Sequence, residues 1–362
     1  MPMYDTVALD EARRALVIID QTQLPNREAL LYLTELEDMR EAICALKVRG
    51  APAIGVAASI AIYLEASKIA RTLECRDNGN NDMFYAAFLA AKEKLNSARP
   101  TAVNLSWALN RMERAALAGI DSSAPLGQIL MHLRDECMAI KDEDARICEA
   151  IGRHGLELLM PGMGLLTHCN AGRLATSSRY GTATAPIYLG HERGYGFKVF
   201  CDETRPLLQG ARLTSYELCA AGIDTTLICD NMAAALMRSG RIGAVLVGCD
   251  RVAANGDTAN KIGTLYTAIA AKHYGIPFYV FAPSPTIDFE CDTGQSITIE
   301  QRAASEVTET WFSERTAPDS VKVFNPGFDV TSAELITAII TEYGVARPPY
   351  RESLKALRTP LL

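Results

Sequence analysis

A cysteine near the middle of the chain has the surroundings of a reactive residue. Cys169 lies in the segment Thr167–Gly172, where an apolar run typical of a strand ends and the sequence turns through Asn170 towards a predicted helix. Backbone N–H groups at such a turn favour the thiolate, which can act as a base or a nucleophile. Side chains alternate along a strand, so His168 is expected on the opposite face and no Cys–His pair is predicted. The alternative is a core cysteine with no chemical role.

A carboxylate holds a similar place after a second apolar run. Val245–Val247 leads through Gly248 and Cys249 to Asp250, and a polar loop follows. Apolar surroundings favour the protonated form of a carboxyl group, and this form can act as a general acid. The alternative is that Asp250 caps a turn or pairs with the adjacent Arg251.

Two other segments have residues suited to binding an anion. In Val48–Gly55, Gly50 permits a tight turn before an alanine-rich helix, and free backbone N–H groups at a helix start attract anions. Arg49 adds a guanidinium group suited to phosphate oxygens. Asn260 and Lys261 are expected in the early turns of another helix, where a cation is disfavoured unless it binds a ligand. For the first segment, the alternative is a plain turn with an exposed arginine.

Metal and cofactor sites are not indicated by the sequence. The Gly-x-Gly motifs at 162–164 and 194–196 precede predicted strands and do not continue as GxGxxG, which argues against a dinucleotide site. The ten cysteines are scattered singly, and the five histidines form no HxH or HExxH motif. We therefore predict no metal and no cofactor, and the scattered cysteines suggest reduced thiols in a cytoplasmic protein.

The elements that position these residues change in character along the chain. In the N-terminal third we expect three short strands followed by helices, one of them after a capping-box sequence at Thr34–Glu37. The expected segments are the strands 6–9, 15–19 and 29–33 and the helices 53–70, 82–97 and 101–117. The polar segment Gly119–Gly127 is the best candidate for a boundary between two domains, residues 1–125 and 126–362.

In the C-terminal two thirds, short apolar runs alternate with predicted helices. The runs are continuously apolar, as expected for strands buried on both faces of a parallel sheet. They are 165–169, 198–202, 226–230, 245–250, 277–281 and 321–325. Most end in a polar residue, and open parallel sheets bind ligands at the carboxyl ends of their strands. We predict an α/β protein with a Rossmann-like C-terminal domain and a largely parallel sheet, preceded by a small N-terminal domain of antiparallel strands and helices.

The composition is that of an ordinary globular protein. The chain has 362 residues, of which 49% are hydrophobic and 22% charged, and its length favours two domains. A net charge of −7 argues against a nucleic-acid partner. The apolar segment Ala51–Leu64 is interrupted by Pro52 and Gly55, so we expect a core helix and no membrane span.

Several motifs, in a fixed order, resemble those of the S-methyl-5-thioribose-1-phosphate isomerase family. They are VRGAPAIG (48–55), RPTAVNL (99–105), THCNAG (167–172), DETRPLLQGARLT (202–214), CDRVAANGDTANKIGT (249–264) and NPGFDVT (325–331). The resemblance covers almost the whole chain. The wider superfamily also contains ribose-1,5-bisphosphate isomerases, 5-deoxyribose-1-phosphate isomerases and regulatory subunits of the exchange factor for translation initiation.

The resemblance implies a Rossmann-like domain without a dinucleotide, a homodimer, and a catalytic pair formed by Cys169 and Asp250. It assigns substrate contacts to seven further residues, which are Arg49, Gly50, Ala51, Arg99, Gln209, Asn260 and Lys261. Three residues depart from the family pattern. Gly327 stands where Ala is more usual, Ser332 where Pro is more usual, and Cys249 where Ala is more usual. The first two lie away from the implied site, and Cys249 should face away from Asp250, so we expect activity to be retained.

The implied reaction converts S-methyl-5-thio-ribose 1-phosphate, an aldose, into S-methyl-5-thio-ribulose 1-phosphate, a ketose, in methionine salvage. Because phosphate esterifies the anomeric oxygen, ring opening needs an acid at the ring oxygen, a role that suits Asp250. The Cys169 thiolate suits the base. The alternatives are a 5-deoxyribose-1-phosphate isomerase and a non-catalytic regulatory subunit on the same fold. The presence of both reactive residues favours an enzyme.

Overall fold

The computed structural model describes residues 5–74, 81–99 and 102–358 and contains two compact units. The N-terminal unit comprises Met3–Arg146 together with Arg173–Arg179. The C-terminal unit comprises Ile147–Gly172 and Tyr180–Leu362. The segment Arg173–Arg179 therefore belongs to the N-terminal unit, although the residues on both sides of it in the sequence belong to the C-terminal unit.

The N-terminal unit begins with an antiparallel sheet of three strands in the order β1-β2-β3, as the sequence predicts. The strands are β1 (Val7–Asp10), β2 (Ala15–Ile19) and β3 (Leu30–Leu33). The central strand β2 is buried along its whole length. Its side chains Leu16 and Ile18 belong to the same apolar core as the helices that follow.

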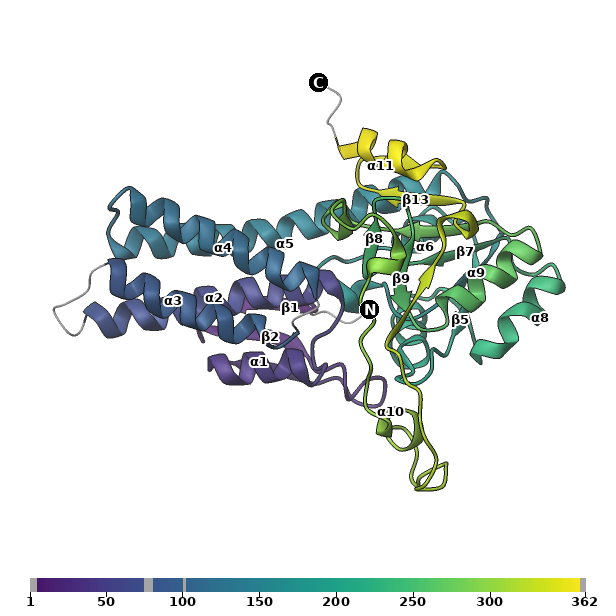
Figure 1. Cartoon of the computed structure of the whole chain (residues 1–362), viewed down its shortest axis with the longest axis horizontal. Coiled ribbons are helices and arrows are strands. Elements are labelled where there is room, and N and C mark those ends of the chain that lie inside the picture. Colours follow the sequence, from purple (N-terminus) through teal and green to yellow (C-terminus); the bar gives the residue numbers. More distant parts are fainter. Residues whose placement is uncertain (1–4, 75–80, 100–101, 359–362) are drawn as a thin grey trace. The chain divides into compact units, whose positions relative to one another are not determined.

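Helices follow this sheet in the N-terminal unit, and the last of them continues into the C-terminal unit (Figure 1). They are α1 (Leu36–Cys44), α2 (Ala51–Glu74), α3 (Asn81–Asn96), α4 (Val103–Asp121) and α5 (Leu126–Leu156). The prediction of a capping box at Thr34–Glu37 is wrong, because α1 has Glu35 as its N-cap and no side chain caps it. The predicted domain boundary falls in the turn between α4 and α5.

The long helix α2 lies at the centre of the N-terminal unit. By length and composition its segment Ala51–Leu73 could cross a membrane, but 72% of an 18-residue window is buried inside the protein. Residues 53–62 are buried one after another, so apolar side chains on every side of the helix contact protein. The helix packs against α1, α3 and α4, which agrees with the expected core helix.

The C-terminal unit is built on a seven-stranded sheet in the order β14-β13-β10-β7-β4-β5-β6. Its strands are β4 (Gly164–Thr167), β5 (Lys198–Asp202), β6 (Asp224–Ile228), β7 (Ala244–Val247), β10 (Phe278–Phe281), β13 (Ala338–Thr341) and β14 (Gly344–Ala346). Neighbouring strands are parallel except for the antiparallel pair β13 and β14. The largely parallel sheet predicted from the continuous apolar runs is confirmed.

Alternate side chains of each strand point to opposite faces of this sheet, and helices cover both faces. Leu165 of β4 packs in one core with the end of α5 and with α6 and α7, whereas Leu166 packs in a second core with α8, α9 and α11. These helices are α6 (Ala185–Glu192), α7 (Ser215–Ala220), α8 (Ala233–Arg238), α9 (Thr264–His273) and α11 (Tyr350–Arg358). The two cores explain why the strands are apolar on both sides.

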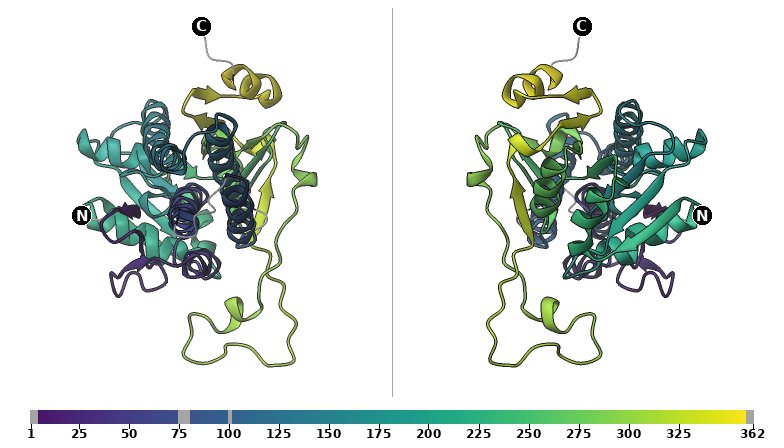
Figure 2. Two further views of the ribbon diagram at one scale, coloured as in Figure 1. Left: turned by 90° about the vertical axis from the view of Figure 1, so that its left-hand side faces the viewer. Right: turned by 90° about the vertical axis from the view of Figure 1, so that its right-hand side faces the viewer.

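A smaller sheet follows β7 in the chain, in the order β11-β8-β9-β12. Its strands are β8 (Arg251–Ala253), β9 (Thr258–Lys261), β11 (Ile287–Asp288) and β12 (Phe328–Thr331). The prediction of a strand at 321–325 is wrong. That segment belongs to a long excursion with the short helix α10 (Ser305–Thr308), which extends away from the sheets (Figure 2). Its apolar residue Phe324 is 82% exposed, so no sheet covers it.

Candidate active site

The order of strands in the seven-stranded sheet reverses between β4 and β7. From β4 the chain proceeds outwards through β5 and β6, and it then returns to β7 and continues through β10 and β13 on the other side. Open parallel sheets bind ligands outside the carboxyl ends of the strands at such a reversal. Cys169 follows the end of β4, and Asp250 follows the end of β7. The residues that the sequence nominates as thiolate and acid therefore both lie at this reversal.

The backbone of Cys169 has an unusual conformation that its neighbours hold in place. Its φ angle is +65°, in the left-handed region that few residues other than glycine adopt. Its N–H donates to Thr204 Oγ1 at 2.8 Å, and its carbonyl oxygen accepts a hydrogen bond from Thr214 Oγ1 at 2.6 Å. The residue is half-buried. Residues strained in this way concentrate at functional sites, which supports a chemical role for Cys169.

The loop after β5 supplies one of the hydroxyl groups that hold Cys169. Thr204 also has a left-handed backbone, with φ +66°, and its hydroxyl donates to the Asp202 carbonyl oxygen at 3.0 Å. The carboxylate of Asp230, after β6, accepts hydrogen bonds from the backbone N–H groups of Thr204 and Arg205, both at 2.7 Å. The polar residues at the ends of these two strands therefore fix the loop that contacts Cys169.

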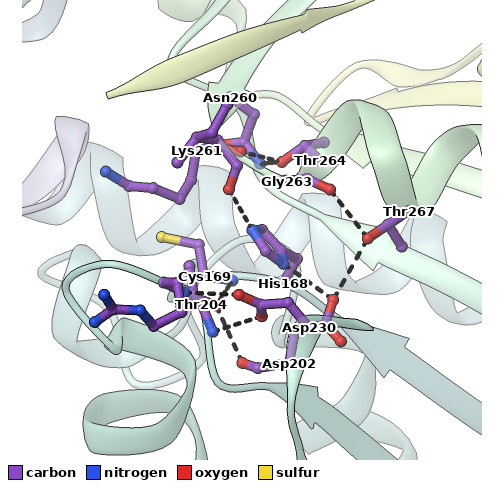
Figure 3. A network of polar contacts seen from close by, with 12 residues as sticks. His168, Cys169, Asp202, Thr204, Asp230, Asn260, Lys261, Gly263, Thr264 and Thr267 are labelled. Atoms are coloured by element: carbon purple, nitrogen blue, oxygen red, sulfur yellow. Dashed lines mark hydrogen bonds and ion pairs between the residues drawn. The ribbon is translucent and has the colours of Figure 1, made fainter. Parts of the chain in front are cut away.

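His168 is buried and makes two polar contacts through its ring (Figure 3). Nδ1 lies 3.0 Å from Asp202 Oδ2, and Nε2 lies 2.9 Å from the carbonyl oxygen of Ile262. Burial lowers the pKa of His168, but the hydrogen bond and charge of Asp202 outweigh burial and the net shift is upward. Burial raises the pKa of Asp202, although the contact with His168 acts in the opposite direction.

The same histidine is the centre of a possible metal-binding group. Ligand atoms of His168, Asp202 and Asp230 lie within 4.8 Å of one another. The ring nitrogens of His168 make hydrogen-bond contacts with Asp202 and with the Ile262 carbonyl, and both carboxylate oxygens of Asp230 accept backbone N–H groups. The donor set therefore fits a hydrogen-bonded support better than a metal centre.

Asp250 lies on the other side of the strand reversal and is half-buried. Its backbone N–H donates to the Ala259 carbonyl oxygen at 2.9 Å, so it leads directly into the antiparallel pair β8 and β9. The adjacent Arg251 lies 3.6 Å from Asp288 of β11, which gives that guanidinium a carboxylate partner. The pairing of β8 with β9 also brings Asp250 near Asn260, the residue that follows Ala259.

Asn260 and Lys261 are placed on β9, and the prediction that they lie in early helical turns is wrong. They pair with β12 in an antiparallel ladder, and α9 begins only after Gly263. Asn260 Nδ2 donates to Thr264 Oγ1 at 3.1 Å, and both Asn260 and Lys261 are buried. Lys261 Nζ lies 5.0 Å from the centre of the Phe328 ring. In Figure 3 the side chains of Lys261 and Cys169 extend to the same side.

Gln209 follows the loop after β5 and is 5% exposed. Its Oε1 atom is buried and has no hydrogen-bond partner among the described residues. The residue stands between Leu208, with φ +56°, and the π-helical segment Gly210–Thr214. A buried acceptor without a donor is costly, and π-helical turns are frequent at functional sites. Gln209 Oε1 therefore suits a hydroxyl group of a bound ligand.

The predicted anion-binding turn lies in the N-terminal unit. Gly50 has φ +94°, and a Cβ atom there would stand 2.5 Å from the backbone of Ala175, so only glycine fits. Ala51 begins α2. Arg49 Nε donates to Gln21 Oε1 at 3.2 Å, and Gln21 Nε2 donates to the Leu174 carbonyl oxygen at 2.7 Å. The turn is thus fastened to the segment Arg173–Arg179, which follows Cys169 closely in the chain.

Arg99 is also in the N-terminal unit, in the turn after α3, where it is half-buried. Its carbonyl oxygen accepts a hydrogen bond from the Ala102 N–H at 3.0 Å. The two residues between them lie outside the described part of the chain. The structure therefore divides the predicted site residues between the two units, with Cys169 and Asp250 in the C-terminal one.

Sequence reasoning missed the residues that support the site. Thr204 and Thr214 both occur in the motif at 202–214, but nothing in their spacing reveals that they bind the N–H and the carbonyl oxygen of Cys169. Gln21 lies outside every motif that carried the resemblance, and its contacts with Arg49 and Leu174 appear only in the folded chain.

Comparison with known proteins identifies relatives along nearly the whole chain. A protein from Symbiobacterium thermophilum named methylthioribose-1-phosphate isomerase is 61% identical, over 98% of this chain and 96% of that protein. A protein from Petrotoga mobilis named 5-deoxyribose 1-phosphate isomerase is 56% identical, over 97% of this chain and 98% of that protein. The crystal structure of 5-methylthioribose 1-phosphate isomerase from Pyrococcus horikoshii OT3 has a TM-score of 0.89 at 41% identity, covering 99% of this chain and 96% of that chain.

The resemblance stated from the motifs is thereby confirmed, and so is the fold class. The sequence model of the initiation factor 2 subunit family matches residues 47–348. This match includes both halves of the predicted site, from Arg49 to Lys261. The chain belongs to the initiation factor 2 subunit family.

Proposed function

We propose that this protein is an aldose–ketose isomerase that converts S-methyl-5-thio-ribose 1-phosphate into S-methyl-5-thio-ribulose 1-phosphate, a step of methionine salvage. The observation that carries the proposal is the position of a strained cysteine and a carboxylate, Cys169 and Asp250, at the strand reversal. Relatives at 61% and 41% identity bear the name of this isomerase, which supports the choice of substrate.

Asp250 is the proposed acid in ring opening. It gives a proton to the ring oxygen as the bond from that oxygen to C1 breaks, because the esterified anomeric oxygen blocks the ordinary route to the open aldehyde. Asp250 is half-buried and follows β7, a strand that is buried along its whole length.

The thiolate of Cys169 is the proposed base in the transfer of hydrogen from C2 to C1. Formation of the ketone removes the hydrogen on C2 and the proton on the C2 hydroxyl, while C1 gains one hydrogen and the former ring oxygen keeps the proton from Asp250. The proton that leaves the C2 hydroxyl restores the acid form of Asp250, so substrate and product are isomers. The hydrogen on C2 can move as a proton or as a hydride. Isomerisation in D2O separates these two routes, since deuterium enters at C1 only if the C2 hydrogen leaves as a proton.

The remaining predicted residues are proposed to bind the substrate. Arg49, the backbone at Gly50 and Ala51, and Arg99 hold the phosphate through charge-assisted hydrogen bonds and free N–H groups. Gln209, Asn260 and Lys261 contact the sugar and the phosphate. Gln209 has the most direct support, because a substrate hydroxyl would satisfy its buried Oε1 atom.

A second candidate substrate is 5-deoxyribose 1-phosphate, since a relative that is 56% identical over 97% of this chain is named for it. The two sugars share the phosphate and the reacting carbons and differ only at C5. One methylthio group in an apolar pocket changes specificity by only about 1–3 kcal/mol. One enzyme can therefore serve both substrates, and the alternative of a non-catalytic subunit predicts activity with neither.

Measurement of kcat/KM for the two sugar phosphates tests the proposal. We expect conversion of both to the ketose, with the methylthio sugar preferred. A preference for the deoxy sugar would reverse the choice of substrate, and no conversion of either would refute the isomerase. We also propose that the protein is a cytoplasmic homodimer, and light scattering of the purified protein tests the dimer.

A further inference from the structure

The proposed chemistry makes no use of His168, although this residue adjoins Cys169 and is 1% exposed. Burial of a polar ring is costly unless its nitrogen atoms have hydrogen-bond partners, and burial of a charged ring is costlier still. The contacts at each ring nitrogen supply these partners.

The hydrogen-bond partners of His168 define where its protons lie. The Ile262 carbonyl oxygen can only accept a hydrogen bond, so Nε2 at 2.9 Å must carry a proton. Nδ1 faces the Asp202 carboxyl group at 3.0 Å, and a proton is shared in that contact. Imidazole ordinarily binds a proton more tightly than a carboxyl group does, and the net shift of the His168 pKa is upward, which favours an imidazolium facing a carboxylate.

The surroundings are consistent with a retained charge pair. Three acidic groups interact electrostatically with the ring of His168. They are Asp202, Asp230 and Asp329, the last of which lies on β12. Asp329 accepts hydrogen bonds from the backbone N–H groups of Gly263 and Leu265, at 2.8 and 3.1 Å. The turn beside the ring is therefore held from both sides, by His168 and by Asp329.

The chain is shaped to admit the imidazole at this place. Gly263 has φ +101°, and a Cβ atom there would stand 2.8 Å from Cε1 of His168. The glycine of the motif at 249–264 thus makes room for the ring. This close approach is a second observation, independent of the hydrogen bonds, that the structure around Gly263 is built around the ring of His168.

The contacts form a closed circuit that includes Cys169. The Cys169 N–H donates to Thr204, the Thr204 hydroxyl donates to the Asp202 carbonyl oxygen, and the Asp202 carboxylate contacts the ring of His168. The peptide bond between His168 and Cys169 closes the circuit. From the ring, the second hydrogen bond extends to Ile262, directly after Asn260 and Lys261.

We propose that His168 is a positioning residue: as a doubly donating imidazolium between Asp202 and the Ile262 carbonyl, it holds the Cys169 turn and the Asn260–Lys261 strand end in one fixed arrangement. This inference rests on the proposed function for its kinetic consequence. Its structural part, the protonation of His168, is independent of any substrate.

Three variants test the positioning role. In His168→Gln the amide can donate to Ile262, but its oxygen faces the Asp202 carboxylate, so we expect kcat to fall about tenfold or more with a smaller change in KM. In the double variant with Asp202→Asn, the new amide at 202 can donate to that oxygen, and we expect part of kcat to return. The control is His273→Gln, an exposed histidine at the end of α9, which should leave kcat unchanged.

The protonation of His168 is tested by NMR of protein labelled with 15N-histidine. The His168 signals are those absent from His168→Gln, and at neutral and mildly alkaline pH both ring nitrogens should have the shifts of protonated nitrogens. An unprotonated Nδ1 at neutral pH would overturn the imidazolium. A normal kcat in His168→Gln, or no recovery in the double variant, would overturn the positioning role. A wild-type protein without isomerase activity would refute the proposed function and leave the NMR result standing.

Discussion

The two sides of the strand reversal use their polar residues in different ways. On the side of β5 and β6, Asp202 and Asp230 are bound by His168 and by backbone N–H groups, and they hold the loop that contacts Cys169. On the side of β7, Asp250 is half-buried and leads into β8 and β9, where Asn260 and Lys261 lie. Carboxylates that look alike in the sequence therefore divide into a supporting group and a group that we assign to the chemistry.

The largest effect is expected at Cys169, the proposed base. Cys169→Ser replaces a thiol with a hydroxyl group that does not ionise near neutral pH, so we expect kcat to fall on the order of 10²–10⁴-fold. Substrate binding should persist, which equilibrium binding of the sugar phosphate to the variant can measure. Near-normal turnover would remove Cys169 from the mechanism.

Other cysteines supply controls for that experiment. Cys249 adjoins Asp250, but burial raises the pKa of its thiol well above the ordinary value, so it is not expected to react as a thiolate. Cys291 is buried far along the chain, on the segment after β11. Cys291→Ala should cost stability at most and should leave kcat unchanged. Cys75→Ala should act in the same way, although Cys75 lies outside the described residues.

The next effect concerns the N-terminal unit. Arg49→Ala should weaken binding of the sugar 1-phosphate by about 1.5–3 kcal/mol, the contribution of one charge-assisted hydrogen bond, and Arg99→Ala should act similarly. Titration with the phosphorylated and unphosphorylated sugars measures this difference. Equal loss of affinity for both sugars would mean that the arginines are structural.

Gln21→Met sharpens the same test. The substitution removes the hydrogen bonds to Arg49 and to the Leu174 carbonyl, but it leaves the guanidinium in the chain. We therefore expect a rise in KM smaller than that of Arg49→Ala. An effect as large as that of Arg49→Ala would mean that Arg49 has no function without Gln21.

The smallest effect expected is on stability, and it follows from the raised pKa of His168. A raised pKa in the folded state means that folded protein binds the proton more tightly than unfolded protein does. The stability that the pair contributes is complete below the ordinary histidine value of about 6.5 and is lost as pH rises through the raised value. The difference in unfolding free energy between wild type and His168→Gln should therefore shrink with rising pH. A difference that grows with pH would contradict this sign.

The sequence was sufficient to predict the parallel sheet, because strands buried on both faces have continuous apolar runs, as in 198–202. It was also sufficient to place Cys169 and Asp250 at strand ends. It failed for Lys261, since a polar Gly-containing loop followed by a helix does not reveal that the intervening residues pair with β12, far along the chain. It failed at 321–325 for the opposite reason, because a short apolar run occurs there but forms no strand.

The supporting residues could not be predicted because their function depends on contacts between distant segments. Asp202 ends one apolar strand and Asp250 follows another, and only the folded chain shows that Asp202 contacts His168 and is fully buried. Gln21 and Leu174 are likewise far apart in the sequence. Motifs reveal residues that are close along the chain, whereas the network around Cys169 connects four strand ends.

The most direct test of the account compares kcat for Asp250→Asn and Asp202→Asn. Each substitution keeps the shape of the side chain and replaces a carboxyl group that can ionise with an amide that cannot. We expect Asp250→Asn to lose about 10²-fold or more in kcat with little change in KM, because an amide cannot protonate the ring oxygen. Asp202→Asn should lose less than about tenfold, because an amide can still hydrogen-bond a neutral His168. Near-normal turnover in Asp250→Asn, or equal losses in the two variants, would contradict the division between chemistry and support.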